Sequence, residues 1–402
     1  MLTPDYILKL SYGAEEIAGE MMSAVMVQVI RRLLARLKSE NELKFSPTDV
    51  YQIQTLEEAG ILRSEIVKVI QKYTKKQAKE VQDAFEKAGL ESVKYDNKIY
   101  QQAGLSATAL TTSPHLTRLL QRNYEATMHL WDNYTRTTAD VVQQSFIQEC
   151  SKAYNEVAST VIPYNQAIMN SVARLMAQDV RSVLYTHPDG SIHRDTIEVA
   201  TFRAVRTGVN QACANITSQI AHDDGIYLFG TSAHIGARPE HYVWQGKVFW
   251  VDWDELNRRT GINFGDAIPV PDWAKIKYQE FCETTDIGTV TGLCGANCRH
   301  SYYPFIEGLD YVPFQDFDSQ ENAERYNNEQ KARAKERAIR KSKKRIQGYE
   351  EAERSAPTAE LKQKFADKRK KALERLRTQN EDYREFCKEK GLKAQELRLY
   401  VG

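Results

Sequence analysis

The sequence has no hydrophobic run long enough to cross a membrane. Nowhere do apolar residues continue for the roughly 18 positions that a transmembrane helix requires. The N-terminal residues, MLTPDYILKLSYGAEE, also lack a basic stretch followed by an apolar stretch and a cleavage site. We therefore expect neither a membrane protein nor one exported by the general secretory route.

Cysteine is scarce, with 6 residues in a chain of 402. Most of the cysteines are isolated in sequence, which excludes a dense disulfide framework and favours free thiols in a reducing cytoplasm. The exception is the pair Cys294 and Cys298, which is close enough to invite a chemical interpretation.

Extremes of composition are also missing. Hydrophobic residues make up 42% and charged residues 27% of the chain, which is ordinary usage for a globular protein rather than for a disordered or fibrous one. A chain of 402 residues exceeds the usual size of one compact domain, so several modules are expected. We predict an α+β, predominantly α-helical protein with a helical N-terminal region (1–182), a small mixed α+β domain (183–316) and a charged helical tail (317–402).

The N-terminal region has the spacing of amphipathic helices. Apolar residues recur in steps of four from Ile17 to Leu37, and Met22, Met26, Ile30 and Leu34 widen the stripe enough to contact two neighbours. Such a stripe is typical of a helix that packs in the protein's own core, but it could also be a docking face for another protein. Further helices are expected from Pro47, closed by Gly60, and from Ser64 to Ala88, ended by Gly89, followed by a long helical stretch from Ser113.

The middle of the chain changes character. The segment YTHPDGSIH contains an Asp-Gly turn signal between β-tolerant residues, which predicts a short hairpin near Val183. A helix should follow over 195–223, and GIYLFGTSAH, which begins at Gly225, predicts a strand that enters a loop.

Charge is distributed unevenly although the net charge is only +1. From Glu321 onward there are 24 basic and 15 acidic residues, whereas the preceding residues include 31 basic and 39 acidic ones. A sparse apolar spacing, broken around Ser355 and Pro357, predicts an antiparallel helical hairpin that ends near Gly391.

The densest basic run extends from Lys331 to Arg345, with nine basic residues and one acidic residue. A helix with this charge could neutralise DNA phosphates and release counterions, which gives salt-sensitive binding without sequence specificity. The alternative is a solvated helix with weak ion pairs along its surface. The candidate DNA contacts are Lys331, Arg333, Lys335, Arg337, Arg340, Lys341, Lys343, Lys344 and Arg345.

Two long blocks of unusual composition stand out, TSAHIGARPEHYVWQGKVF at 231–249 and LCGANCRHSYYPFIEG at 293–308. We call them the first and second blocks. Together with TFRAVRTGVNQACANITSQIAHDDG just upstream, they resemble the phage minor capsid protein 2 family, which is related in role to the Mu-type and SPP1-type head morphogenesis proteins.

The resemblance implies a low-copy component of a tailed-phage head. Such a protein would bind the portal or the major capsid protein, perform an assembly role in the host cytoplasm and then reside in the virion, as part of an oligomeric head assembly. It would work close to packaged double-stranded DNA, which strengthens the DNA interpretation of the basic tail.

Three interpretations of the polar residues in the blocks remain open. His241, Cys294, Cys298 and His300 offer zinc ligands, although the CxxxCxH spacing is not a standard zinc knuckle. His241 or Cys298 could instead serve an enzyme or toxin-like effector carried in the head, as base or nucleophile, although no complete catalytic motif accompanies them. The third and favoured interpretation needs no cofactor. It is a structural hydrogen-bond network made by His234, Arg238, His241, Gln245, Asn297, Arg299 and His300.

Overall fold

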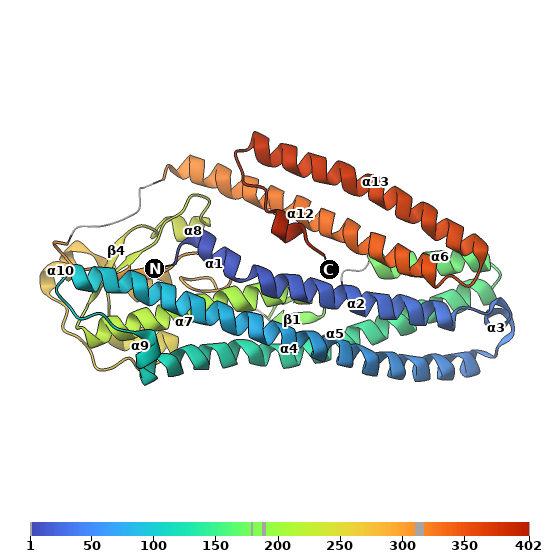
Figure 1. Ribbon diagram of the computed structural model, residues 1–402, viewed down its shortest axis with the longest axis horizontal. Helices are drawn as coiled ribbons and strands as arrows, with labels where there is room; N and C mark the ends of the chain where they lie inside the picture. The colour runs from blue at the N-terminus through green and yellow to red at the C-terminus, as the bar shows by residue number, and fades with distance from the viewer. Residues whose placement is uncertain (1, 178–179, 187–189, 310–316, 402) are drawn as a thin grey trace. The chain divides into compact units, whose positions relative to one another are not determined.

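The structure is a computed structural model that describes residues 2–177, 180–186, 190–309 and 317–401 (Figure 1). The chain divides into two compact units built from interleaved segments. Unit 1 contains residues 1–14, 78–130 and 202–330, and unit 2 contains residues 15–77, 131–201 and 331–402. The division differs from the three consecutive regions expected from sequence, because the long helices α4, α5 and α12 each contribute residues to both units.

The described N-terminal region is almost entirely helical, as predicted. The wide apolar stripe lies on α2 (Tyr12–Arg36), where Ile17, Met21, Val25 and Leu33 are buried and Met26 is half-buried. The stripe is therefore core. The other helices of this region are α1 (Pro4–Leu10), α3 (Glu40–Phe45), α4 (Thr48–Gln102), a 3-10 turn at Leu110–Thr112, α5 (Pro114–Ala158) and α6 (Tyr164–Ala177).

The predicted helix ends at Gly60 and Gly89 were wrong, since α4 continues through both residues. Neither glycine has the positive φ of a helix-ending residue. A Cβ atom on Gly89 would lie 3.0 Å from the Cδ2 of Leu110, so this glycine allows a close approach of neighbouring elements. The apolar face of α4, which includes Leu62, Ile66 and Ile70, is buried and holds the helix together across the weak position at Gly60.

The predicted hairpin is formed by β1 (Val183–Thr186) and β2 (Ile192–Asp195), which pair antiparallel within unit 2. The Asp-Gly turn itself lies partly outside the described residues, which resume at Gly190. The expected helix over 195–223 is confirmed as α7 (Ile197–Asp223).

Unit 1 contains a four-stranded sheet of order β5-β4-β3-β6, made of β3 (Leu228–Thr231), β4 (Val248–Trp250), β5 (Gln279–Glu280) and β6 (Tyr302–Pro304). Strand β3 confirms the strand expected in GIYLFGTSAH. Aromatic side chains of Phe229, Phe281 and Tyr302 contact one another in the core beside the sheet. The short helices around it are α8 (Pro239–Tyr242), α9 (Trp253–Thr260), α10 (Asp272–Lys277) and α11 (Phe281–Thr285).

The C-terminal hairpin consists of α12 (Ser319–Arg354) and α13 (Ala359–Glu389), followed by a 3-10 turn at Glu396–Leu399. The helices are antiparallel, because Lys335 pairs with Asp382 whereas Glu353 pairs with Arg369. Thr358 caps α13 by accepting a hydrogen bond from the amide of Leu361, and Gly391 follows its end with φ of 59°. The α+β, predominantly helical fold class is thus confirmed. Among the described residues, no helix is long and apolar enough to span a bilayer.

Candidate functional site

The two blocks meet because of the sheet topology of unit 1. The first block follows β3 and the second block leads into β6, and these strands pair antiparallel with Thr231 opposite Tyr302. The pairing continues beyond the strands, since the amide of Ser232 donates to the carbonyl of Ser301 at 2.9 Å. The end of one strand and the start of the other therefore lie at the same edge, and the side chains of the two blocks converge there.

Three potential ligand side chains meet at this edge: His241 from α8, and Cys298 and His300 from the loop before β6. The Nδ1 atoms of His241 and His300 are 3.3 Å apart. The Sγ of Cys298 lies 3.8 Å from Nδ1 of His241 and 3.7 Å from Nδ1 of His300. All three side chains are buried, with exposed fractions of 2%, 2% and 1% for His241, Cys298 and His300.

The outer nitrogen of each imidazole faces an oxygen atom. Nε2 of His241 donates to the carbonyl of Thr291 at 2.7 Å, and Nε2 of His300 donates to Oε1 of Gln245 at 3.0 Å. The orientation of the Gln245 amide is fixed, because its Oε1 also accepts from the backbone amide of His234 at 3.0 Å. Both rings thus carry their proton on Nε2 and turn the Nδ1 lone pair toward Cys298.

Burial keeps these groups neutral. It lowers the pKa of His241 below the ordinary value and lowers that of His300 further, to which nearby His234 and His241 also contribute. Burial also raises the pKa of the Cys298 thiol. A buried thiol with a raised pKa is a poor nucleophile, so the geometry does not favour the enzymatic interpretation of Cys298.

Cys294, the fourth metal candidate, is not part of this group. Its Sγ lies 3.9 Å from the carbonyl of His300, and burial raises its pKa well above the ordinary value. His234 is adjacent but offers its ring face, since it stacks on His300 with centroids 4.4 Å apart.

The loop that carries Cys298 has a backbone conformation that few residue types can adopt. Asp286, Cys294 and Asn297 all adopt positive φ angles, which non-glycine residues rarely do. A Cβ atom on Gly292 would lie 1.9 Å from the carbonyl oxygen of Asp286, and one on Gly295 would lie 2.5 Å from that of Val290. Only glycine fits at these two positions.

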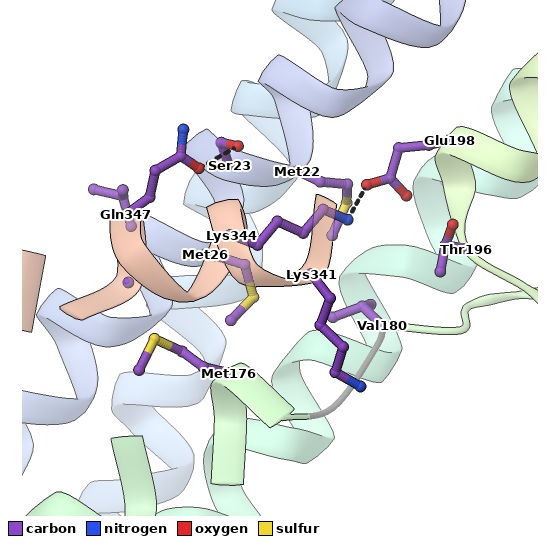
Figure 2. A pocket seen from close by; sticks show the side chains of 12 residues that line it. Met22, Ser23, Met26, Met176, Val180, Thr196, Glu198, Lys341, Lys344 and Gln347 are labelled. Carbon is purple, nitrogen blue, oxygen red and sulfur yellow. Dashed lines mark hydrogen bonds and ion pairs between the residues drawn. The ribbon is translucent and has the colours of Figure 1, made fainter. Parts of the chain in front are cut away.

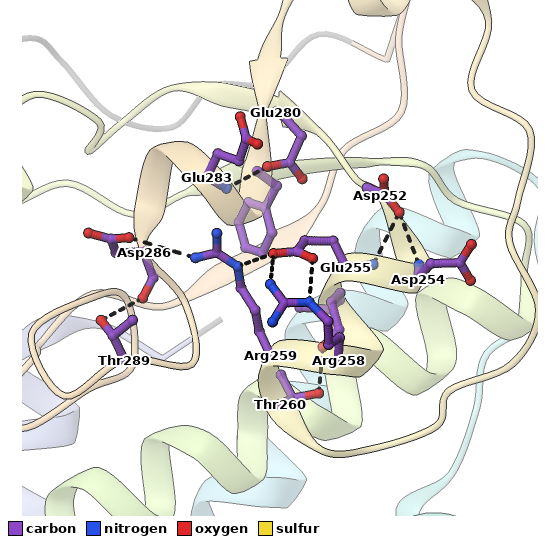
Figure 3. A network of polar contacts seen from close by, with 12 residues as sticks. Asp252, Asp254, Glu255, Arg258, Arg259, Thr260, Glu280, Glu283, Asp286 and Thr289 are labelled. Atoms are coloured by element: carbon purple, nitrogen blue, oxygen red, sulfur yellow. Dashed lines mark hydrogen bonds and ion pairs between the residues drawn. The ribbon is translucent and has the colours of Figure 1, made fainter.

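The start of this loop is held by an ion-pair network (Figure 3). Arg259 bonds the carboxylate of Glu255 at 2.5 Å and lies 3.7 Å from that of Asp286. The Thr289 hydroxyl donates to the carbonyl of Asp286 at 2.8 Å. The network therefore joins α9 to the turn from which the second block departs.

The structure places hydrogen bonds and an ion pair at residues of the two blocks, and these contacts include further residues outside the blocks. Arg238 donates to the carbonyl of Ala296, and Arg299 pairs with Glu329 at 3.1 Å. Residues that sequence reasoning missed take part as well: Arg206 donates to the side chain of Asn297, Asn210 donates to the carbonyl of His300, and Asn322 binds the backbone of Gly236 and Ala237.

Some of the missed residues could have been identified from the sequence, and others could not. Arg206 and Asn210 are four apart on one face of α7, inside the upstream segment of the resemblance, and could have been included. Thr291 acts through its carbonyl, and Asn322 lies in the tail, so neither leaves a usable signal.

The basic run on α12 is less exposed than a solvated charge run would be. Lys335 pairs with Asp382 at 2.5 Å, Lys344 pairs with Glu198, and Arg340 and Lys343 donate to carbonyls near the C-terminus. Arg333, Lys341 and Arg345 are half-buried, whereas Lys331 and Arg337 are exposed.

Helix α13 exposes more positive charge than this run. Its exposed basic residues are Lys362, Lys368, Lys370, Lys371, Arg375, Arg377, Arg384 and Lys388.

Unit 2 also contains a small pocket beside α12 (Figure 2). Met22, Met26 and Met176 line it, together with Lys344 and Glu198, which form an ion pair. Its polar lining residues are Ser23, Thr196, Glu198, Lys341, Lys344 and Gln347, of which Ser23 bonds Gln347 and Lys344 pairs with Glu198.

Comparison with known proteins relates the chain to a phage protein family and to a phage structural protein. The model of the family described as phage minor capsid protein 2 matches residues 2–386. A protein of Lactococcus phage LL-H, described as a structural protein, is 24% identical over 341 residues, which cover 82% of this chain and 84% of that protein. No solved structure matches the chain. The family match spans both blocks, the helical N-terminal half and most of the tail, so the chain belongs to the phage minor capsid protein 2 family.

Proposed function

We propose that the protein is a low-copy structural component of a tailed-phage head that joins the portal or major capsid protein during assembly and contacts packaged DNA. The observation that carries the proposal is the family match over residues 2–386, supported by the similarity to a phage structural protein. Assembly would take place in the host cytoplasm, and the virion would be the final location.

A docking surface for a head protein is available on unit 2. The first turns of α4 expose Val50, Ile53 and Leu56, and Phe45 just before them is 78% exposed. Val50, Ile53 and Leu56 are three residues apart, so they lie along one side of the helix. Exposed apolar side chains that share one side of a helix are typical of a protein interface. This exposed surface is the candidate docking face in place of the apolar stripe on α2, which is buried.

The DNA contact is best supplied by α13. Lys368, Lys371 and Arg375 recur at spacings of three and four, so they share one side of the helix, and all three are exposed. Neither helix of the hairpin has a motif for recognising bases, so binding would depend on phosphate neutralisation alone.

Quantitative mass spectrometry of purified, DNA-filled virions tests the head assignment. We expect a few copies of this chain per particle, near or below the number of portal subunits. Phage carrying Ile53→Asp and Leu56→Asp should incorporate several-fold fewer copies, whereas Leu90→Asp, an exposed leucine elsewhere on α4, should not. Absence of the wild-type chain from mature particles would overturn the proposal.

Binding of the purified chain to duplex DNA at several salt concentrations tests the DNA contact. In the triple variant Lys368→Gln, Lys371→Gln and Arg375→Gln, the slope of log affinity against log salt should fall by about 0.9 for each lost phosphate contact. The matched control removes the same charge from exposed lysines of α4 in unit 1, through Lys87→Gln, Lys94→Gln and Lys98→Gln. Equal losses in both variants would show that only net charge matters and would reject α13 as the contact.

A further inference from the structure

We infer that unit 1 binds one zinc ion through Nδ1 of His241, Sγ of Cys298 and Nδ1 of His300. These atoms come from the two blocks, belong to buried side chains and lie within 4.8 Å of one another. Imidazole nitrogen and thiolate sulfur are the ligands that zinc prefers in proteins.

The distances match tetrahedral coordination. Zinc binds nitrogen at about 2.0–2.1 Å and sulfur at about 2.3 Å, so two nitrogen ligands should be about 3.3–3.4 Å apart and nitrogen and sulfur about 3.5–3.6 Å apart. The observed separations are 3.3 Å between the nitrogens and 3.7 and 3.8 Å from the sulfur to each of them. Only a small adjustment of Cys298 is required.

The hydrogen bonds of the two imidazole rings favour a cation between them and Cys298. Because Nε2 of each ring faces an oxygen that can only accept, both Nδ1 atoms present lone pairs. Two lone pairs at 3.3 Å repel each other, and the thiol proton of Cys298 can satisfy only one of them. A cation at the centre satisfies all three ligand atoms at once.

The surroundings are those of a metal site. Ligating histidines usually donate their second nitrogen to a carbonyl or carboxylate, as His241 and His300 do through Thr291 and Gln245. The backbone amide of His300 donates to the Sγ of Cys298 at 3.4 Å, which would stabilise a thiolate.

Three protein ligands leave a fourth corner open, as in catalytic zinc sites, but the burial of all three side chains favours a structural ion. All three ligand side chains are buried, and they join segments 57 residues apart in the sequence, between His241 and Cys298. Cys294 is not a ligand in this assignment, and the fourth corner goes to a small ligand such as water. The ion would fasten the loop of the second block to α8.

Metal analysis of the purified full-length chain, prepared without chelators, tests the inference. We expect about one zinc per chain, falling below about a tenth in Cys298→Ser, which is nearly isosteric, and in His300→Asn, which keeps a polar side chain. Cys294→Ser is the matched control and should keep its zinc. Reconstitution with Co²⁺ should give the visible bands of a tetrahedral site and a thiolate charge-transfer band, which Cys298→Ser removes.

A second measurement uses the wild-type chain, so it tests the inference even if the variants fail to fold. Chelator treatment of the wild-type chain should lower its melting temperature, and added zinc should restore it. A wild-type chain that contains no metal and binds neither Zn²⁺ nor Co²⁺ would overturn the inference. A Cys298→Ser variant with unchanged cobalt spectra would do the same. Neither outcome depends on virion incorporation or DNA binding, so failure here is distinguishable from failure of the proposed function.

Discussion

The edge of the sheet in unit 1 and the charged helices of unit 2 use polar residues in different ways. Around His241 and His300, polar groups lie on short loops and satisfy one another's backbone and side-chain atoms. On α12, polar groups lie on regular helix and pair mainly across the hairpin or with neighbouring helices, as Lys335 does with Asp382. A loop site depends on exact backbone geometry, whereas a helix tolerates local change because its backbone bonds form regardless.

The largest expected effect is on the loop side of this comparison. Gly292→Ala places a Cβ atom 1.9 Å from the carbonyl oxygen of Asp286, and backbone cannot move aside as a flexible side chain can. We expect a loss of about 3 kcal/mol or more in the stability of unit 1. Denaturant unfolding followed by tryptophan fluorescence measures it, since Trp244, Trp250, Trp253 and Trp273 all lie in unit 1. A loss below about 1 kcal/mol would show that the loop can adopt another conformation.

A second prediction concerns an ion pair of unit 2 in which Glu198 is buried and Lys344 is half-buried. Lys344→Met removes the cation beside Glu198, a residue with an exposed fraction of only 9%, and should cost about 3 kcal/mol at neutral pH. The double variant Lys344→Met with Glu198→Leu should recover much of this loss, because no buried charge then lacks a partner. Urea unfolding compares the stability of the single and double variants. Equal losses of stability in both would show that the unpaired charge of Glu198 is not the cause.

The same pair has a predictable pH dependence. Burial tends to raise the pKa of Glu198, but the Lys344 ammonium more than offsets it and holds that pKa below its ordinary value of 4.5. A depressed folded-state pKa contributes stability above the ordinary value, and this is lost as the pH falls below it. In Lys344→Met, burial without the ammonium raises the Glu198 pKa above its ordinary value. The deficit of the variant should therefore be large at pH 7 and shrink as the pH falls toward and below about 4.5, because protonation removes the unpaired buried charge. Unfolding measured across this range checks the sign.

The smallest expected effect lies on the helix side. Gly60→Ala places its Cβ in open space on α4, so it should stabilise unit 2 by about 0.5–1 kcal/mol through helix propensity alone. Replacing glycine by alanine is thus expected to increase the stability at Gly60 and to decrease it at Gly292. Thermal unfolding followed by circular dichroism detects the gain, and destabilisation by Gly60→Ala would mean that α4 needs a flexible point there.

Local signals in the sequence predicted much of the fold. The four-residue spacing from Ile17 to Leu37 identified α2 and its buried face, and the break near Pro357 identified the C-terminal hairpin. The same kind of signal failed at Gly60 and Gly89, because burial of the apolar face of α4 outweighs the weak helix preference of single glycines.

The candidate site was only partly accessible from the sequence. His241, Cys298 and His300 were named from residue type, but Cys294 was named with them for the same reason. Residue spacing could not show which cysteine faces the histidines, because that depends on the loop backbone, in which Cys294 and Asn297 adopt positive φ angles that the sequence does not indicate.

The sequence by itself determined the periodic elements and the family, because helix periodicity and the two blocks are properties of consecutive residues. Only the tertiary structure decided which cysteine joins the two histidines, which nitrogen of each ring faces it, and which lysines and arginines are exposed. These outcomes depend on the pairing of β3 with β6 and on side-chain packing between segments far apart in the chain. A rule that considers only neighbouring residues in the sequence cannot predict such contacts.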